Sequence, residues 1–396
     1  MEDLSRAAGE IADWLRAERR WLHAHAETGF QLPQTVRHVA DALAQMGLQP
    51  VQCGRCGLVA DVGVGERFVL LRADMDALPI GEEADLPFAC RDGRMHACGH
   101  DMHTAMLLGA SRLLKAREGQ LPGRVRLMFQ PAEEILSGAA DMLADGLLED
   151  GRCVGAYMLH VLTGVDLPTG TAIVSAPGVS APAAAFFRIA VQGKGCHGAQ
   201  PHNGVDPLLT AARIALGLQH IRAGELPMAE SAVLTLGMLR AGESANVIPD
   251  RAEMAGSLRA FSDEALGMML RRAEEIATGV AQAFRARAAF SVTGRAPTLL
   301  NDAELSQRAM HSLTALLGEA CVKRSDALGE EARRNGGSED FAHISHAAPA
   351  LMVALAAGRP QDGHVHPAHH PQATFDEAAL PIGAAAYAAL ALSALG

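Results

Sequence analysis

The sequence predicts an α/β protein with a mostly parallel sheet, helices on both of its faces, and an inserted α+β domain of ferredoxin-like βαββαβ order. Three observations lead to this prediction. Short apolar runs alternate with longer helical periods before residue 160 and again after residue 300. Between them, residues 185–294 follow the order strand, helix, strand, strand, helix, strand. With 396 residues, the chain also exceeds the length at which one hydrophobic core usually stops growing.

Residues 1–182 are predicted to form the first part of the main domain. The predicted elements are helices over 5–22, 33–47, 101–116 and 137–146, and strands over 58–64, 67–73, 124–130 and 154–160. Helices that connect short apolar strands are typical of a parallel sheet, because each crossover returns the chain to the same edge.

The inserted domain is predicted over 183–297, and the main domain then resumes over 298–396. The insert has strands over 185–193, 231–240, 251–260 and 286–294, with helices over 206–222 and 263–285. The second part of the main domain has a helix over 302–317 and a buried strand over 349–356. The Ala-rich tail is predicted to be a packed helix rather than a membrane span, since Ala contributes little to insertion.

Composition and charge exclude several classes of protein. A net charge of -11 and the lack of a basic block argue against a nucleic acid partner. The charged N-terminus does not resemble a secretory signal, so we expect a cytoplasmic protein with no membrane partner. Seven cysteines, an odd number in a long chain, are expected to be reduced thiols.

Cys53 and Cys56 form a lone CxxC motif, which suits a redox pair, half of a zinc site, or a glycine-rich turn. A strand follows the motif, and the sequence has no second CxxC. The turn is therefore the favoured interpretation.

Polar side chains stand where the predicted parallel strands end. Asp74 and Asp76 follow strand 67–73, Glu133 and Glu134 follow strand 124–130, and His160 ends strand 154–160. Cys98 and His100 come directly before helix 101–116. Ligand sites in open α/β sheets lie at the carboxyl ends of the strands, so we expect these groups to converge on one edge.

Thiolate, imidazole and carboxylate together are the ligand set of zinc, with manganese, cobalt or nickel as further candidates. The number of carboxylates allows two ions, which can activate a water between them. In an extended segment Glu133 and Glu134 would point in opposite directions, so that one ligates and the other acts as a general base.

Each motif also has a plain structural interpretation. The CGHDMH segment can be a helix start capped by Asp101, the Glu133–Glu134 pair can be the start of a surface helix, and the Asp74–Asp76 pair can be a turn. The loop that holds His364, His366, His369 and His370 can be merely polar or can scavenge metal. Their joint position at strand ends favours the metal site, which this loop is placed to close.

These motifs resemble the co-catalytic metal aminoacylases and carboxypeptidases, in the branch that holds hippurate hydrolase, N-acyl-L-amino acid amidohydrolases and auxin-conjugate hydrolases. The resemblance spans nearly the whole chain. The matching segments are LRADMDALPI (71–80), MHACGHDMHTAMLLGA (95–110), FQPAEE (129–134), MLH (158–160), GKGCHGAQPHNGVDP (193–207), ANVIPD (245–250), GSLRAF (256–261), GGSEDFA (336–342) and HHPQATFDEAALPIGA (369–384).

The resemblance implies two divalent metal ions per subunit, zinc or manganese first. The implied ligands are Cys98, as the bridge, with His100, Glu134, His160 and His369. Glu133 would be the general base, Asp76 would orient His100, and Asp101 would be a cap or an outer support of the site. His103 is expected to be structural, and His366 is the alternative to His369.

In the inserted domain, the resemblance implies that His197 reaches a neighbouring subunit's site and stabilises the oxyanion. Asn246 and Arg259 would hold the substrate carboxylate, and His202 is a further candidate for substrate binding. A homodimer, or a tetramer of dimers, would form through this domain. Cys196 departs from the family, which usually has Gly before this histidine.

The implied function is hydrolysis of the amide bond of N-acyl-L-amino acids, which are small-molecule substrates, to a carboxylic acid and a free amino acid. One alternative is a dipeptidase or carboxypeptidase with the same two-metal site. A metal-binding or regulatory module with an inactive site is a further alternative, against which the presence of Glu133 argues. The sequence leaves the preferred acyl group, the amino acid and the native metal open.

Overall fold

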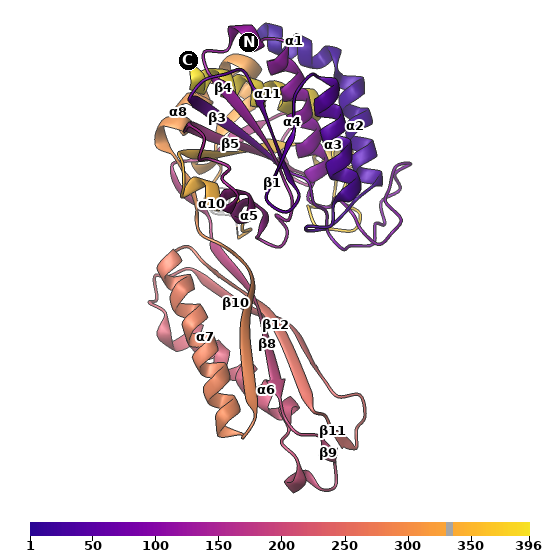
Figure 1. The fold of residues 1–396 in the computed structure, drawn as a ribbon, viewed down its shortest axis with the longest axis vertical. Coiled ribbons are helices and arrows are strands. Elements are labelled where there is room, and N and C mark those ends of the chain that lie inside the picture. Colours follow the sequence, from indigo (N-terminus) through magenta and orange to yellow (C-terminus); the bar gives the residue numbers. More distant parts are fainter. Residues whose placement is uncertain (330–335) are drawn as a thin grey trace. The chain divides into compact units, whose positions relative to one another are not determined.

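The computed structural model describes residues 1–329 and 336–396 (Figure 1). The chain forms two compact units. Unit 1 contains Met1–Ser180, Asp340–Gly396 and the described residues of the stretch that begins at Leu299. Unit 2 contains Ala181–Thr298 and Gly336–Glu339. Unit 2 is thus inserted in unit 1, with changes of unit close to the predicted boundaries, but the short return at Gly336–Glu339 is not foreseen by the sequence.

The main sheet of unit 1 has eight strands in the order β1-β2-β4-β3-β5-β16-β6-β15. They are β1 (Val51–Cys53), β2 (Gly57–Val62), β3 (Arg67–Asp74), β4 (Arg124–Gln130), β5 (Arg152–Leu162), β6 (Ala172–Val174), β15 (Val322–Arg324) and β16 (Ala350–Ala356). At its centre β3 pairs in parallel with β4 and β5, and β5 with β16. The carboxyl ends of these four strands therefore meet at one edge.

The outer part of the sheet is mixed, because β1–β2, β2–β4 and β16–β6 pair antiparallel. Two short strands, β7 (Gly178–Ala181) and β14 (Leu299–Asn301), form a small separate sheet. The sequence did not predict β1, β6, β7, β14 or β15. Each of these strands has only three or four residues, which is too short to show a clear period.

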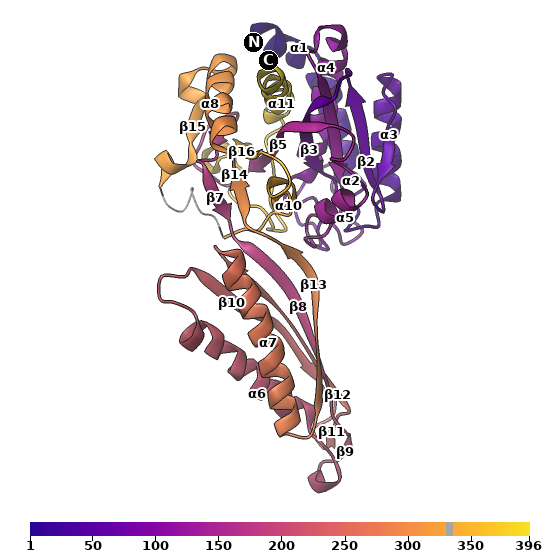
Figure 2. The ribbon, with the colours of Figure 1, turned by 60° about the vertical axis from the view of Figure 1, so that its left-hand side comes forward.

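Eight described helices belong to unit 1. They are α1 (Glu2–Glu10), α2 (Ala12–Ala24), α3 (Pro33–Gln45), α4 (His100–Lys115), α5 (Gly138–Ala144), α8 (Ala303–Leu317), α10 (Ala342–Ser345) and α11 (Ala379–Leu395). Helices α4 and α11 pack against each other and both contact β3 and β5, while α2 packs on the outer side of α4 (Figure 2). The predicted helix 5–22 is two helices, interrupted at Ile11.

Helix α4 is buried over almost its whole length, since only Arg112 and Lys115 among its residues are not buried. This burial fixes the start of α4, where Cys98 and His100 lie. Of the helices that the structure describes, none combines the length and the apolar character that a membrane span requires.

Unit 2 has a four-stranded antiparallel sheet in the order β10-β12-β8-β13. The elements are β8 (Ala183–Gln192), α6 (Pro207–His220), β10 (Ala232–Ala241), β12 (Arg251–Ala260), α7 (Asp263–Ala283) and β13 (Arg287–Ala296). Their order is the predicted βαββαβ. Helices α6 and α7 pack together and against the sheet, over a core separate from that of unit 1.

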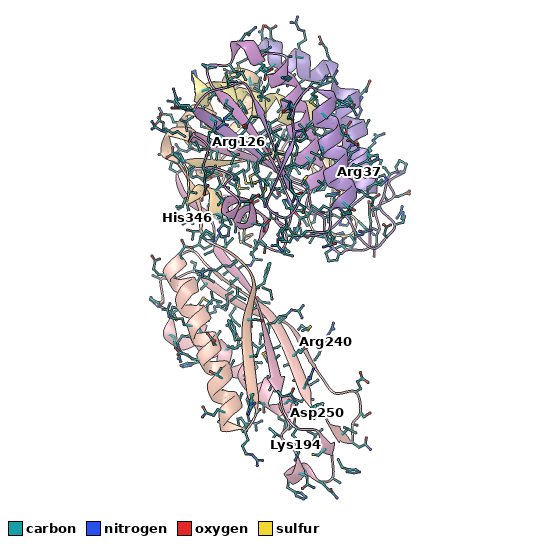
Figure 3. All side chains as sticks on the ribbon, in the orientation of Figure 1. Arg37, Arg126, Lys194, Arg240, Asp250 and His346 are labelled. Carbon is teal, nitrogen blue, oxygen red and sulfur yellow. The ribbon has the colours of Figure 1, made fainter. Side chains whose placement is uncertain are left out.

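A two-residue ribbon extends unit 2 at one end. It consists of β9 (Cys196–His197) and β11 (Val247–Ile248), which pair antiparallel (Figure 1). Lys194 and Asp250, which flank this ribbon in the sequence, are labelled in Figure 3. The Asp250 carboxylate accepts a hydrogen bond from the Gly195 amide at 2.7 Å, which holds the base of the ribbon.

Candidate metal centre

The five predicted metal ligands lie together in unit 1, at the carboxyl edge of the central strands. Glu134 follows β4, His160 lies near the end of β5, and His369 comes from the segment after β16. Cys98 and His100 stand at the start of α4, on either side of Gly99. The sheet topology thus joins residues that are up to 271 positions apart.

Cys98 lies at the centre of this group. Its Sγ is 3.5 Å from His160 Nε2 and 3.3 Å from His369 Nε2. Glu134 Oε1 is 3.8 Å from His369 Nε2 and 3.9 Å from His100 Nε2. The donor atoms form two compact sets, one of Cys98, His100 and His160 and another of Cys98, Glu134 and His369. Both sets contain Cys98, as its predicted bridging role requires.

The second ring nitrogens orient two of the histidines. His100 Nδ1 donates to the main-chain oxygen of Asp76 at 2.8 Å, and His160 Nδ1 donates to that of Val161 at 2.8 Å. The Nε2 atoms are therefore turned to the cluster. Among the described residues, His100 Nε2 and Glu134 Oε1 are buried without a hydrogen-bond partner. Such atoms suit cation ligands, so the residues present fit a metal site.

The charges in this cluster are strongly coupled. Burial by itself opposes ionisation of the Cys98 thiol, but His160 and His100 hold its pKa well below the usual value. Burial, with the Cys98 thiolate beside it, raises the pKa of Glu134 to about 8. A cation bound here would displace the proton of the Glu134 carboxyl group, because metal ligands must be deprotonated.

Glu133 and Glu134 lie in a turn, which corrects the extended arrangement predicted from the sequence. Ala132 and Leu136 on either side have positive φ values of 57° and 52°. As a result the two carboxylates do not point apart: Glu133 Oε2 is 4.0 Å and Glu134 Oε1 is 3.9 Å from His100 Nε2. Glu133 is 6% exposed, so its carboxylate is largely shielded from water.

Asp76 supports this turn. Its carboxylate accepts hydrogen bonds from the amides of Glu133 at 3.0 Å and Glu134 at 3.2 Å. The expectation that this carboxylate also orients His100 stays a prediction. The bond from His100 goes to the main-chain oxygen of Asp76, and the carboxylate Oδ1 is 3.7 Å from His100 Nδ1.

Asp101 points toward α2 rather than toward the ligands. Its Oδ2 accepts from Arg19 Nε at 2.7 Å and from His23 Nδ1 at 2.8 Å. The predicted helix cap is not formed, because the N-cap of α4 is Gly99, which makes no side-chain capping bond.

His103 is held as a structural group. Its Nδ1 donates to Asp74 Oδ1 at 2.6 Å, and its Nε2 accepts from the Val161 amide at 2.8 Å. Burial lowers its pKa to about 4, so the ring is neutral and both nitrogens are used.

Among the C-terminal histidines, it is His369 that reaches Cys98. Its backbone has a positive φ of 68°, and its amide donates to the Ala97 oxygen at 2.9 Å. The alternative ligand, His366, stacks on His370 instead, with ring centroids 4.0 Å apart. His364 Nδ1 lies 2.9 Å from the Thr374 hydroxyl.

Asp74, which was expected at this edge of the sheet but was given no role of its own, lies beside His100. Its Oδ2 is 3.5 Å from His100 Nε2 and 2.7 Å from Arg72 Nη1. Burial opposes its ionisation, but Arg72 and the neighbouring histidines hold its pKa well below the usual range. A charged residue inside the apolar strand 67–73 was the available signal for this pairing.

The four predicted residues of unit 2 fall into two groups. His197 lies on the ribbon and Asn246 directly precedes its second strand, where the Gly198 amide donates to the Asn246 oxygen at 2.8 Å. His202 follows in the short turn Pro201–Asn203. Arg259 is near the other end of β12, where its Nη1 donates to Gly336 O at 2.7 Å and to Ser338 Oγ at 3.1 Å.

The CGRC segment is a turn between β1 and β2. Cys53 Sγ donates to Met142 O and Cys56 Sγ to Phe30 O. Burial raises the pKa of each thiol to about 11, so neither is a reactive thiolate at neutral pH.

Comparison with known proteins agrees with this fold. Residues 70–393 match the model of peptidase family M20/M25/M40. N-acetylcysteine deacetylase of Bacillus subtilis is 35% identical over 95% of this chain and 96% of its own length. IAA-amino acid hydrolase ILR1-like 2 of Arabidopsis thaliana is 34% identical, with 98% and 86% covered, and thermostable carboxypeptidase 1 of Saccharolobus solfataricus is 32% identical, with 99% and 98% covered.

A solved structure leads to the same class. A dinuclear metal-binding peptidase of Bacillus subtilis superposes with a TM-score of 0.73 at 33% identity, over 97% of this chain and 98% of that one. The fold and the paired ligand sets define a metal-dependent hydrolase of linear amides with a dinuclear site. The chain belongs to the M20/M25/M40 family.

Proposed function

We propose that this protein hydrolyses the amide bond of N-acyl-L-amino acids to a carboxylic acid and a free amino acid. The observation that carries the proposal is the pair of ligand sets that share Cys98, with the Glu133 carboxylate beside them. The thiolate, imidazole and carboxylate donors favour zinc or manganese, with cobalt or nickel as alternatives. The names of the amidohydrolase relatives support an acylated amino acid as the substrate.

In the proposed mechanism Cys98, His100, Glu134, His160 and His369 hold two divalent ions. When bound, the ions lower the pKa of a water and polarise the acyl carbonyl. Glu133 takes a proton from the attacking water and delivers it to the leaving nitrogen. Asp76 serves this step indirectly, because its carboxylate fixes the amides of Glu133 and Glu134.

His197 is proposed to stabilise the oxyanion of the tetrahedral intermediate. Its Nδ1 accepts a hydrogen bond from the Ala199 amide at 3.0 Å, which leaves the ring proton of a neutral imidazole on Nε2. His197 is exposed, so this donor faces outward. His202, in the next turn, is proposed to assist in binding substrate.

Arg259 is proposed to bind the substrate carboxylate, because the guanidinium group matches a carboxylate in geometry and charge. Asn246 was expected to share this task. However, Asn246 precedes the ribbon, and the eight residue steps of β12 from Arg251 to Arg259 span about 27 Å. This distance far exceeds the length of a small acylated amino acid.

That separation supports a site shared by two chains. If His197 and Asn246 act on the same substrate as Arg259, they must come from different subunits, as in a homodimer or a tetramer of dimers formed through unit 2. We also propose a cytoplasmic location, which is supported by the seven free cysteines.

The test is a panel of N-acetyl, N-benzoyl and indoleacetyl L-amino acids, assayed with enzyme whose metal content is measured. We expect at least one acylated amino acid to be hydrolysed, with kcat/KM reduced at least tenfold for its D enantiomer. Fully metal-loaded enzyme that cleaves none of the panel would contradict the proposal.

A dipeptidase or carboxypeptidase is the second candidate, which the carboxypeptidase relative favours. Matched pairs such as N-acetyl-methionine and alanyl-methionine separate the two, because a dipeptidase requires the α-amine that acylation removes. A higher kcat/KM for the dipeptide would favour this second candidate.

A further inference from the structure

Four buried charged side chains join α2 to the turn that carries Cys98 and His100. This group, here termed the Asp101 cluster, consists of Arg19, His23, Glu82 and Asp101. Arg19 is 1% exposed, and His23 and Asp101 are fully buried. The sequence analysis gave no role to Arg19, His23 or Glu82, so this cluster has no counterpart in the motifs that pointed to the metal site.

The bonds within the Asp101 cluster fix its charges. His23 Nδ1 faces Asp101 Oδ2 at 2.8 Å, and His23 Nε2 faces Glu82 Oε1 at 3.0 Å. Since both partners are carboxylates, both ring nitrogens must donate, and His23 is an imidazolium ion. With Arg19 Nε donating to Asp101 Oδ2 at 2.7 Å, the cluster holds two cations and two anions, and Arg19 Nη1 also lies 3.4 Å from Glu377 Oε1.

The Asp101 cluster contacts both ends of the segment that supplies the ligand Cys98. Residues 75–99, which the structure describes in full, form only turns, bends and isolated bridges. Glu82 lies near the start of this irregular segment, and its second oxygen accepts from the Cys90 amide at 2.8 Å. Asp101 lies just past its end. His23 thus holds both sides of the segment that supplies Cys98.

Asp101 also follows His100 directly in the first turn of α4. Its carboxylate is bound to α2, so the rotation of this turn, and with it the direction of the His100 ring, depends on Arg19 and His23. Phe88 covers the cluster, with its ring centroid 4.8 Å from the Arg19 guanidinium. Metal ligands must be held within about 0.5 Å of their working geometry, which packed and bonded supports provide.

From these contacts we infer that Arg19 and His23 are positioning residues for the metal-binding turn at Cys98 and His100, and that they act through Asp101. The inference rests on the proposed metal centre. It assigns to α2 a role in metal affinity, whereas a purely structural role would affect only the free energy of unfolding.

The experiment measures metal affinity of the full-length protein by competition with a chromophoric chelator. The variants are His23→Gln, which loses the charge, and Arg19→Lys, which keeps it but removes the planar fork. Loss of an outer support of a metal ligand typically weakens metal binding about 10-fold to 100-fold. We expect losses in this range, and a changed absorption spectrum of the cobalt-loaded thiolate site.

Arg126→Lys is the matched control. Arg126, labelled in Figure 3, is 6% exposed and is also paired with two carboxylates, with its Nη2 2.9 Å from Asp61 and its Nη1 2.6 Å from Asp150. Its hydrogen bonds go to Asp61, Asp150 and the Leu147 main-chain oxygen, so this variant should be less stable but bind metal within about twofold of wild type.

Wild-type affinity in both folded α2 variants, or an equal loss in Arg126→Lys, would overturn the inference. If His23→Gln does not fold, the metal affinity of Arg19→Lys alone tests the inference. Failure of the wild-type protein itself to bind two ions would instead contradict the proposed metal centre, so the two failures are distinguishable.

Discussion

Two neighbouring carboxylates, Glu133 and Glu134, show how position rather than residue type assigns a role. Both are bonded through their amides to Asp76 and both face His100. Only Glu134, however, belongs to a set with Cys98 and His369. The proposed division is therefore Glu134 as ligand and Glu133 as base, and substitution of each residue separates the two roles.

For Glu133→Gln we expect kcat to fall about 10²-fold to 10⁴-fold, the usual contribution of a general base, with two ions still bound. Glu134→Gln, its neighbour, should instead lose metal. Steady-state rates and metal content measured on the same samples check both statements. A Glu133→Gln enzyme with undiminished kcat would exclude the catalytic role.

At the scale of elements, the start of α4 depends on one glycine. Gly99 lies between two proposed ligands in the left-handed region, with φ 84°. A Cβ added there would meet Val161 Cγ2 at 2.4 Å and the Phe375 ring at 3.0 Å. Close approach of this turn to β5 is what brings Cys98 near His160, so any side chain at 99 moves the two ligands apart.

Gly99→Ala is expected to lower the free energy of unfolding by at least about 1 kcal/mol, from the left-handed conformation alone. Gly9→Ala in α1 is the control, because no atom lies within 4 Å of its added Cβ and helix propensity should raise stability by about 0.5 to 1 kcal/mol. Urea unfolding followed by fluorescence measures both. Equal effects of the two substitutions would show that the turn at Gly99 is not constrained.

At the scale of the whole molecule, the two units can be observed separately. The chain has two tryptophans, Trp14 and Trp21, and both lie in unit 1. All five proposed ligands lie in the same unit. Intrinsic tryptophan fluorescence therefore reports on the unit that is expected to bind metal.

Metal loading is expected to stabilise unit 1 by mass action. At a free metal concentration 100 times Kd, one site adds about 2.7 kcal/mol. The midpoint of thermal unfolding followed by tryptophan fluorescence should rise with added metal and fall again with a chelator. A thermal unfolding midpoint that does not change when metal is added would argue against a metal site in this unit.

The Asp101 cluster gives unit 1 a pH-dependent stability. Burial opposes protonation of His23, but Asp101 and Glu82 raise its pKa above the usual value. The unfolded value is about 6.5, so this stabilising contribution is fully present below about pH 6.5 and is lost as the pH rises through the folded pKa.

We therefore expect the wild-type free energy of unfolding to decline above pH 6.5 more steeply than that of His23→Gln. Urea unfolding of both proteins between pH 6 and 9, in the presence of a chelator, measures the difference. Parallel pH profiles would show that His23 keeps its usual pKa.

The sequence by itself determined the element types, the βαββαβ insert and the residues that could ligate a metal, because these follow from local periodicity and from polar residues at strand ends. It could not determine how those residues are oriented. The turn at Glu133, the bond from His100 to the Asp76 main chain, and the bond between Arg19 and Asp101, 82 positions apart, depend on contacts between distant segments.

Tertiary structure alone decided two further points. It placed Arg259 and His197 at opposite ends of unit 2, because β12 is extended and pairs with β8 over all ten of its residues. It also turned Asp101 away from the ligands, because a buried carboxylate needs a partner and α2 supplies two cations. Charge pairing in a buried environment is a property of the packed chain, and no local pattern encodes it.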